Sequence, residues 1–447
     1  MQAAARLLRL ALLAPCAVLL IGSAPADTRQ HEGVASCASS TCHGRQEATG
    51  PRVRQNEVLT WQDPASLTGA HSRAWSVLAQ PRGQAIGRRL GIANVQASAE
   101  CILCHGDPAI AREPAKGPGW QQSDGVGCEA CHGGATRWLA SHAAVGATHA
   151  QNVARGMTAI DRPSVRAGVC LDCHWGSSRP GQFVPHRVMA AGHPRLTFEL
   201  DLFTALQSHH DEDADYAARK GVAGGIKVWA VGQAMAVERA LAVWPVRAGG
   251  SFPEFGFFDC RSCHRSFSDD PAVALTARIN AARPIPPGQP VWNDENMLML
   301  SAAAKVAAPA QGKRFDAAAR AFHTANGGDR AGAIKAAAVM RAAAADLAVT
   351  LEQAAFSRTQ GFAMIDAVLV GSAGVYTDYQ GGAQAVMAAD TLLSAMVASR
   401  AVDRDAALAL RPEFDRAYAQ ARDANSWRPE PLRAALARIA ARIRALQ

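Results

Sequence analysis

The 447-residue sequence lacks the features that would support several common classes of protein. It has 11 cysteines, but one lies in an N-terminal apolar run and the other ten form five close pairs. No thiol is therefore left for a disulfide framework or for nucleophilic catalysis. Lysine and arginine exceed the acidic residues by eight, yet they form no stripe interleaved with aromatic residues. This absence argues against a nucleic-acid partner.

The N-terminal residues have the pattern of a secretory signal peptide. Arg6 and Arg9 precede an apolar run from Leu10 to Ile21, and Ala24-Pro25-Ala26 forms a small-residue cleavage site. The apolar run is too short to span a bilayer comfortably. We expect residues 1–26 to be removed on export to the periplasm, which leaves a mature chain without a transmembrane anchor.

The five cysteine pairs share one pattern, in which the second cysteine is followed at once by histidine. Such Cys-x-x-Cys-His units attach c-type haem: the two thiols form thioethers and the histidine binds the iron. A single unit could equally be a zinc site or a redox dithiol, but five copies in an exported chain predict five covalently attached haems c. The units are Cys37/Cys42 with His43, Cys101/Cys104 with His105, Cys128/Cys131 with His132, Cys170/Cys173 with His174, and Cys260/Cys263 with His264.

The first unit differs from the others because four residues, not two, separate Cys37 from Cys42. The extra loop could bulge outward while both sulfurs still reach the porphyrin, and the His43-Gly44 ending matches the other units. Haem attachment is the expectation here, and a disulfide is the alternative.

The sixth ligand of each iron decides what a haem can do. A second histidine suits electron transfer, whereas an open position can bind a substrate. Nine histidines lie outside the five units, more than five haems could use. We expect distal ligands among His71, His142, His149, His186 and His193; His209 and His210 are weaker candidates, and His31 and His323 are not expected to bind iron.

Hydrophobic periodicity and turn residues indicate a mainly α fold, with irregular loops around stacked haems. The expected helical features in this part are a helix after Asp63-Pro64 carrying His71 and Trp75, a helix start at Gly192-His193-Pro194 with an apolar face from Leu196 to Leu206, and a helix from Gly225 to Trp244. If the segment between His142 and His149 is helical, the two imidazoles share a face.

A Pro-rich run from Pro284 to Pro290 is predicted to separate two domains. Residues 27–290 hold all five haem units. Residues 291–447 are Ala-rich and free of cysteine, and they are predicted to form a helical bundle. Its expected helices span 298–307, 315–326, 330–355, 385–397, 404–410, 413–424 and 431–446.

The run Gly125-Val126-Gly127-Cys128-Glu129-Ala130-Cys131-His132-Gly133, with His142 after it and Cys101-Ile-Leu-Cys104-His105 before it, resembles the cytochrome c-554 family. Members are tetrahaem electron carriers that accept electrons from hydroxylamine oxidoreductase. The likeness covers roughly residues 31 to 176. It implies that His142 binds the haem of His43, that His71 binds the haem of His132, and that the haem of His105 has an open sixth site.

The sequence departs from that family in several respects. The family has two-residue spacing in its first unit, its distal histidine follows that unit more closely than His71 does here, and it lacks a fifth haem and a helical C-terminal region. We therefore predict a pentahaem electron carrier acting between other periplasmic or membrane-bound redox proteins.

Two other functions remain open. One is an oxidoreductase acting on a small nitrogen or sulfur compound at a five-coordinate haem, where Arg73, Arg137 or His149 would handle charge and protons. The other makes residues 297–447 a docking module that selects a redox partner.

Overall fold

The computed structural model describes residues 30–50, 54–111, 116–210, 216–218, 221–247, 254–264, 283–284, 289–423 and 427–447. The expected signal peptide and most of the Pro-rich run lie outside these ranges. Within them the fold is mainly α, as predicted, and β pairing is limited to two isolated bridges, His31 with Lys116 and Phe258 with Trp292. No helix of the described residues is both long and apolar enough to cross a membrane.

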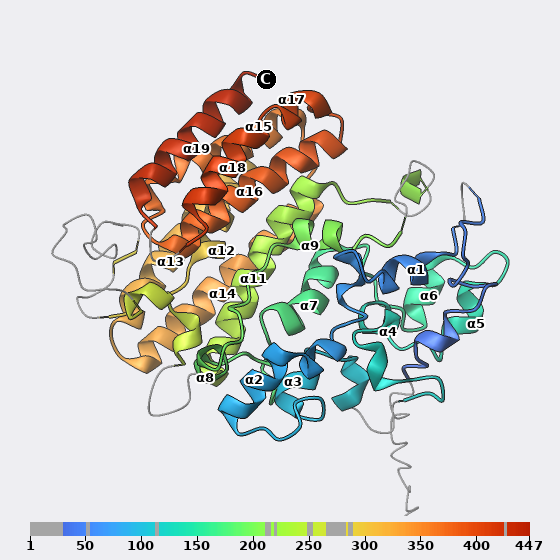
Figure 1. Cartoon of the computed structure of the whole chain (residues 1–447). Coiled ribbons are helices and arrows are strands. Elements are labelled where there is room, and N and C mark those ends of the chain that lie inside the picture. The colour runs from blue at the N-terminus through green and yellow to red at the C-terminus, as the bar shows by residue number, and fades with distance from the viewer. Residues whose placement is uncertain are drawn as a thin grey trace, which may run out of the picture.

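The N-terminal half consists of short helices joined by turns and loops (Figure 1). The α-helices are α1 (Glu57–Gln62), α2 (Pro81–Leu90), α3 (Ala99–Ile102), α4 (Cys128–His132), α5 (Leu139–His142), α6 (His149–Ala154), α7 (Pro163–His174), α8 (His186–Ala190) and α9 (Leu200–Leu206). The 3-10 turns are η1 (Val34–Ser36), η2 (Thr68–Ala70), η3 (Ser76–Ala79), η4 (Pro108–Ala111), η5 (Gln122–Asp124), η6 (Phe255–Phe257) and η7 (Cys260–Ser262).

The C-terminal part is made of longer helices, as the periodicity predicts. They are α12 (Glu295–Ala307), α13 (Pro309–Asn326), α14 (Arg330–Gln353), α15 (Arg358–Asp366), α16 (Tyr379–Ala398), α17 (Arg404–Leu408), α18 (Arg411–Gln420) and α19 (Pro429–Arg444), with the π-helical turn η10 (Ala367–Gly371) and the 3-10 turn η11 (Ala373–Val375). The sequence pattern missed α15, which begins with a capping box between Ser357 and Gln360.

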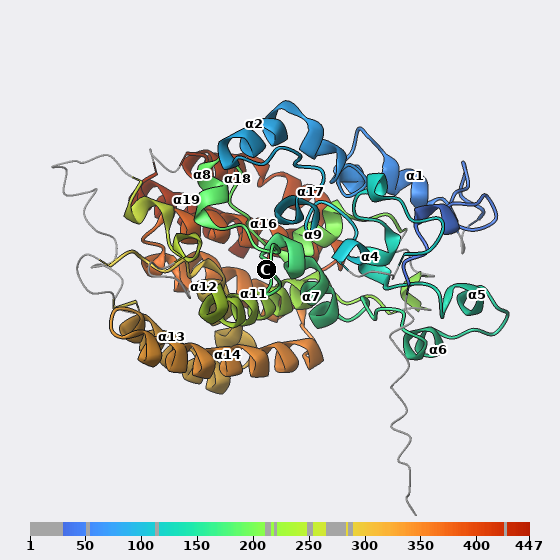
Figure 2. The same cartoon turned by 90° about the horizontal axis from the view of Figure 1, so that it is seen from below.

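Helix α11 (Gly225–Arg247) lies between the two parts (Figures 1 and 2). It packs against α7 and α9 of the N-terminal half and against α12, α14 and α16 of the bundle. Trp229, Val231 and Ala234 in its middle are fully buried. A helix that is apolar on all sides belongs inside a core. One hydrophobic cluster joins α11 to the bundle, and a second one joins it to α7 and α9.

An aromatic cluster extends this core toward the fifth cysteine pair. The ring of Trp292 lies 5.4 Å from Phe257, 5.5 Å from Trp244 and 5.0 Å from Phe322. Each such pair adds about 0.5–1.5 kcal/mol beyond its buried area. Phe257 ends η6, just before Cys260, so these contacts hold the fifth unit against the bundle.

A buried ion-pair cluster lies close to the same region. The guanidinium of Arg283, which is 1% exposed, donates to Asp294 and to Asp378, both at 2.7 Å, and to the hydroxyl of Thr377 at 2.9 Å. Asp294 is the N-cap of α12 and Asp378 is the N-cap of α16. The one side chain therefore holds two helix starts together.

The predicted helix start at Gly192-His193-Pro194 is wrong, because the helix begins at Leu200. Its first free amides, those of Asp201 and Leu202, donate to the carboxylate of Glu199 at 3.0 and 2.6 Å. A helix begins where its unpaired amides find an acceptor, and Glu199 supplies it.

The helix expected over His71 and Trp75 is also wrong, and the condition under which His142 and His149 would share a face is not met. The segment carrying His71 and Trp75 forms the 3-10 turns η2 and η3 with turns between them, not an α-helix. His142 and His149 belong to the separate helices α5 and α6, because Gly146 between them adopts a left-handed φ of 80° that interrupts a helix.

Burial of Glu199 predicts a pH-dependent stability. The side chain is fully buried, and burial raises the pKa of its carboxyl from 4.5 to about 7. Because the folded state binds this proton more tightly than the unfolded state does, Glu199 contributes stability that is fully present below pH 4.5. The contribution is lost as the pH rises through about 7. Because of Glu199, the free energy of unfolding of the wild type should fall by up to about 3 kcal/mol between pH 5 and pH 8. This fall should be absent in Glu199→Gln.

Denaturant unfolding of the holoprotein at pH 5 and pH 8 measures this difference. Glu100→Gln, a change at an exposed carboxylate beside Arg187, is the control and should leave the pH dependence unchanged. An equal pH dependence in Glu199→Gln and the wild type would contradict the prediction.

Candidate haem sites

Each cysteine pair lies on a helical turn that ends at its histidine. In the second and fifth units the amide of the histidine donates to the carbonyl of the first cysteine, His105 to Cys101 at 3.0 Å and His264 to Cys260 at 2.7 Å. The third and fourth units form α4 and the C-terminal end of α7, both of which end at the motif histidine.

The first unit has the same closing bond despite its longer loop. The amide of His43 donates to the carbonyl of Cys37 at 3.0 Å, and Ser39, Ser40 and Thr41 between the two cysteines are exposed. Gly44 permits this turn, because a Cβ there would lie 1.9 Å from the carbonyl oxygen of Ala38. The backbone of this unit is thus arranged like that of the others, and Cys37 and Cys42 form no disulfide.

The fifth unit differs from the second, third and fourth in its exposure. Cys260, Cys263 and His264 are all exposed, whereas both cysteines of each of those three units are partly buried. The amide of Cys263 donates to the carbonyl of Cys260 at 3.3 Å, so the pair lies on a turn at the surface, just after the buried Phe257 and Phe258. The described residues therefore enclose this unit less than the others, and haem attachment at Cys260 and Cys263 stays a prediction from the motif.

Every motif histidine faces at least one second imidazole. The distances between ring centres are 6.2 Å for His43 and His142 (site 1), 6.3 Å for His105 and His193 (site 2), 6.3 and 6.1 Å for His132 with His209 and His210 (site 3), 6.0 Å for His174 and His71 (site 4), and 5.9 Å for His264 and His186 (site 5).

These distances fit an iron between the rings. A metal lies about 2 Å from an imidazole nitrogen, so two rings on opposite sides of one iron have centres roughly 6 Å apart. Direct stacking of aromatic rings also permits such distances, but it does not require each pair to contain a motif histidine.

The second ring nitrogen supports the same interpretation. Metal-bound histidine commonly donates its other N–H to a carbonyl or carboxylate, which fixes the orientation of the ring. Six site histidines do so through Nδ1, which leaves Nε2 free, and Nδ1 of His210 lies 3.7 Å from a carboxylate oxygen of Glu57. The acceptors are Glu57 for His43, the Gln207 side chain for His71, and the carbonyls of Ala74, Leu139, Pro194 and Gln207 for His105, His142, His193 and His209.

Helix α9 positions two sites at once. The Phe203 ring lies 4.9 Å from His174 at site 4. At the C-terminal end of α9, the side-chain oxygen of Gln207 accepts from His71 Nδ1 at 2.6 Å, and its carbonyl accepts from His209 Nδ1 at 2.8 Å. The Glu199 cap that starts α9 therefore also fixes sites 3 and 4.

At site 5, Glu254 connects the segments that carry the two imidazoles. Its Oε1 accepts from the amide of His186, which begins α8, at 2.7 Å and from the amide of Gly256 in η6 at 2.8 Å. One carboxylate thus holds α8 against the turn that precedes the fifth cysteine pair.

Comparison with known proteins agrees with this arrangement for part of the chain. Residues 36–133 match the family model described as cytochrome c554 and c-prime, and they contain the first three cysteine pairs. This segment is similar to the cytochrome c554 and c-prime family. The chain is therefore a c-type cytochrome of electron transfer with covalently bound haem c. No curated protein and no solved structure matches it.

The c554 match ends at Gly133, so the fourth and fifth units rest on the residues themselves. The resemblance places His71 opposite His132 and leaves the site of His105 open. In the structure His71 lies beside His174, while His193 lies beside His105. His142 lies beside His43, and their binding to one iron stays a prediction.

His149 differs from the other expected ligands. Its Nε2, the nitrogen that would bind iron, lies 2.9 Å from a carboxylate oxygen of Asp161, and the side chain is 38% exposed. His31 and His323 also face carboxylates, those of Asp107 and Asp294. The geometry therefore favours His209 or His210 over His149 as a fifth distal ligand.

Burial keeps most of the site imidazoles neutral. It lowers the pKa of His132 to about 3 and that of His174 and His209 to about 4, and it lowers the pKa of His71, His105 and His193 as well. The neutral ring is the form that binds a metal. The pKa of His43 changes in the opposite direction, because its hydrogen bond to Glu57 raises it.

The sites of this cytochrome adjoin one another in an order that differs from the sequence. The sulfur of Cys37 lies near that of Cys128, and the sulfur of Cys104 lies near that of Cys173. Thus site 1 adjoins site 3 and site 2 adjoins site 4. Helix α4 packs on α7, which brings site 3 next to site 4.

Site 5 adjoins site 2 through Arg195, which follows His193 by two residues. Its guanidinium donates to the carbonyl of Phe258 at 3.1 Å and lies 3.5 Å from the sulfur of Cys260. The contacts therefore give the order 1, 3, 4, 2, 5.

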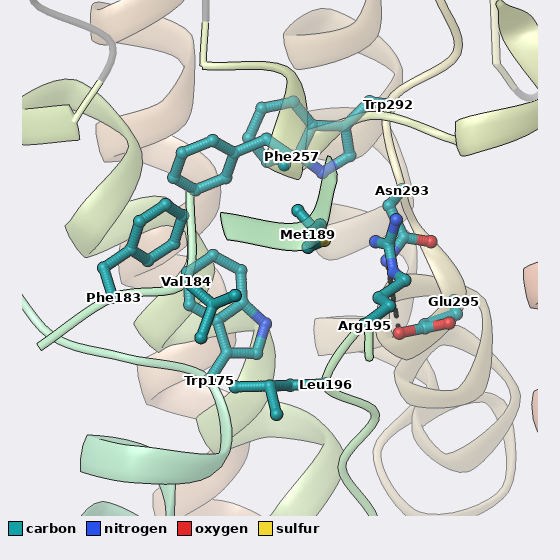
Figure 3. A pocket seen from close by; sticks show the side chains of 11 residues that line it. Trp175, Phe183, Val184, Met189, Arg195, Leu196, Phe257, Trp292, Asn293 and Glu295 are labelled. Atoms are coloured by element: carbon teal, nitrogen blue, oxygen red, sulfur yellow. Dashed lines mark hydrogen bonds between the residues drawn. The ribbon is translucent and has the colours of Figure 1, made fainter. Parts of the chain in front are cut away.

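A small cavity lies between sites 4 and 5 (Figure 3). It measures about 40 Å³, and Trp175, Phe183, Phe257, Trp292 and Arg195 form much of its wall. At the roughly 10–15 Å³ that each water needs, it holds no more than a few waters. It is too small for an organic substrate, and its aromatic wall begins at Trp175, next to His174 of site 4, and ends at Phe257, just before the fifth cysteine pair.

Proposed function

We propose that the protein is a periplasmic pentahaem c-type cytochrome that relays electrons between other redox proteins. The observation that carries this proposal is that each of the five motif histidines faces a second imidazole at about 6 Å, the spacing of two axial ligands. Haem iron held by two histidines supplies one-electron transfer with no open position for substrate.

The chain's own residues would perform three tasks in such a relay. The ten cysteines hold the porphyrins, the paired histidines hold the irons, and the carbonyls and carboxylates on Nδ1 fix the ring orientations. Contact between neighbouring units gives a continuous path from site 1 to site 5. The division into a haem domain (27–290) and a C-terminal helical domain (291–447), with the latter as a docking module, is part of this proposal.

The haem content tests the proposal directly. We expect an iron to polypeptide ratio of five, by the count of motifs, and a wholly low-spin c-type spectrum in the ferric and ferrous states. The double change Cys37→Ser and Cys42→Ser should lower the ratio to four and leave the other haems low-spin. A high-spin signal that disappears on adding nitrite or hydroxylamine, with turnover, would instead support the oxidoreductase alternative.

A further inference from the structure

The carboxylate of Glu57 lies between two of the sites. Its Oε2 accepts from Nδ1 of His43 at 3.0 Å, and its Oε1 lies 3.7 Å from Nδ1 of His210. The side chain is 16% exposed. The two oxygens of one carboxylate thus meet imidazoles that belong to two different sites.

Helix α1 fixes this carboxylate in place from both sides. The amide of Val58 donates to the carbonyl of His43 at 3.1 Å, next to the first cysteine pair. The indole of the buried Trp61 donates to the carbonyl of Val126 at 3.2 Å, two residues before the third cysteine pair. These two bonds connect α1 to both units and keep the backbone of Glu57 between sites 1 and 3.

We propose that Glu57 is a positioning residue shared by sites 1 and 3, which orients the proximal imidazole of His43 and the distal imidazole of His210 and lowers the reduction potential of both irons. This inference rests on the proposed function, because it needs both imidazoles to be iron ligands. It assigns His210, and not His209, as the distal ligand of site 3.

The expected direction follows from ligand chemistry. A carboxylate that accepts the Nδ1 proton makes the imidazole a stronger electron donor, and a stronger donor favours the ferric state. Reduction adds one electron to the iron, supplied by dithionite in a titration, and the proton stays on Nδ1. No bond is formed or broken in this step.

The two candidates at site 3 differ in their partners. His209 donates Nδ1 to the neutral carbonyl of Gln207, whereas His210 faces the charged carboxylate. The His210 ring is also slightly nearer to His132, at 6.1 against 6.3 Å. The two rings are 4.2 Å apart, and a single axial position on the iron takes only one of them.

Glu57→Gln tests the proposal in the holoprotein, because the amide keeps the size of the side chain and removes its charge. In a spectroscopic redox titration we expect the ferrous to ferric ratio of two haems to rise about tenfold at a given potential, or about 59 mV for a one-electron couple. In the Cys37→Ser, Cys42→Ser background only one haem should shift. Asp161→Asn, at the carboxylate beside His149, is the control and should shift none.

A shift of only one haem in the full holoprotein, or of none, would overturn the shared role. His210→Ala should make one haem high-spin while His209→Ala leaves all haems low-spin, and the reverse result would also overturn the proposal. These outcomes differ from a failure of the proposed function, which would already show in the wild type as a ratio below five or a high-spin haem.

Discussion

Replacing His71 with methionine is expected to raise the reduction potential of one haem, the one attached at Cys170 and Cys173, by on the order of 0.1 V. The His71 ring lies 6.0 Å from that of His174, and its Nδ1 is held by Gln207. Methionine is a weaker donor to ferric iron than histidine, so the ferrous state gains stability. A spectroscopic redox titration of the holoprotein measures the shift.

The affected haem can be located through Phe203, whose ring lies 4.9 Å from His174. Its NMR signals should change in His71→Met and stay unchanged in His149→Met, a control at an exposed histidine paired with Asp161. Unchanged Phe203 signals together with a perturbation at the Cys128/Cys131 haem would restore the pairing that the family resemblance implies.

Replacing Arg283 with methionine is expected to lower the free energy of unfolding by about 3–5 kcal/mol. The change leaves the carboxylates of Asp294 and Asp378 buried without their shared cation, at 3% and 5% exposure. Methionine keeps much of the apolar volume of the arginine, so the loss of unfolding free energy comes mainly from the two unpaired carboxylates. Denaturant unfolding of the holoprotein, monitored by far-UV circular dichroism, measures it.

A matched pair of variants separates this effect from packing. Arg162→Met removes an ion pair with Glu352 whose arginine is 60% exposed, and it should cost about 1 kcal/mol or less. The triple change Arg283→Met, Asp294→Asn and Asp378→Asn removes the unpaired charges and should recover part of the loss. If Arg283→Met costs no more than Arg162→Met, the buried cluster is not a determinant of stability.

The sequence was sufficient to predict the mainly α fold and most helices of the C-terminal part, because these depend on local periodicity and punctuation. The helix predicted over 330–355 spans Arg330–Gln353, and the one predicted over 431–446 spans Pro429–Arg444. The cysteine pairs are similarly local, since both thiols and the histidine fall within one turn. How far each pair is buried is not local, and the exposure of Cys260 and Cys263 had no signal in the motif itself.

The partner of each motif histidine was beyond local reasoning. His71 and His174 are brought together by α9, whose start depends on the Glu199 carboxylate and whose end supplies Gln207. Neither Glu199 nor Gln207 belongs to a recognisable sequence motif. Nothing in the sequence distinguishes an imidazole that donates through Nδ1, such as His209, from one that uses Nε2, such as His149.

The positions of the paired histidines along the chain have a consequence for assembly. The partners of His43, His105 and His132 all lie downstream of their motifs, whereas His71 and His186, the partners of His174 and His264, lie upstream. A chain that crosses a membrane from its N-terminus and folds as it emerges presents its first segments first. When the motifs of sites 4 and 5 emerge, their second histidines are already on the same side of the membrane. Sites 1 to 3 would obtain their second histidines only from segments that emerge later. Ligation of sites 1 to 4 would therefore be complete once His210 has emerged, site 5 would follow when its own motif at Cys260 to His264 arrives, and a chain arrested before His193 would carry irons with vacant positions.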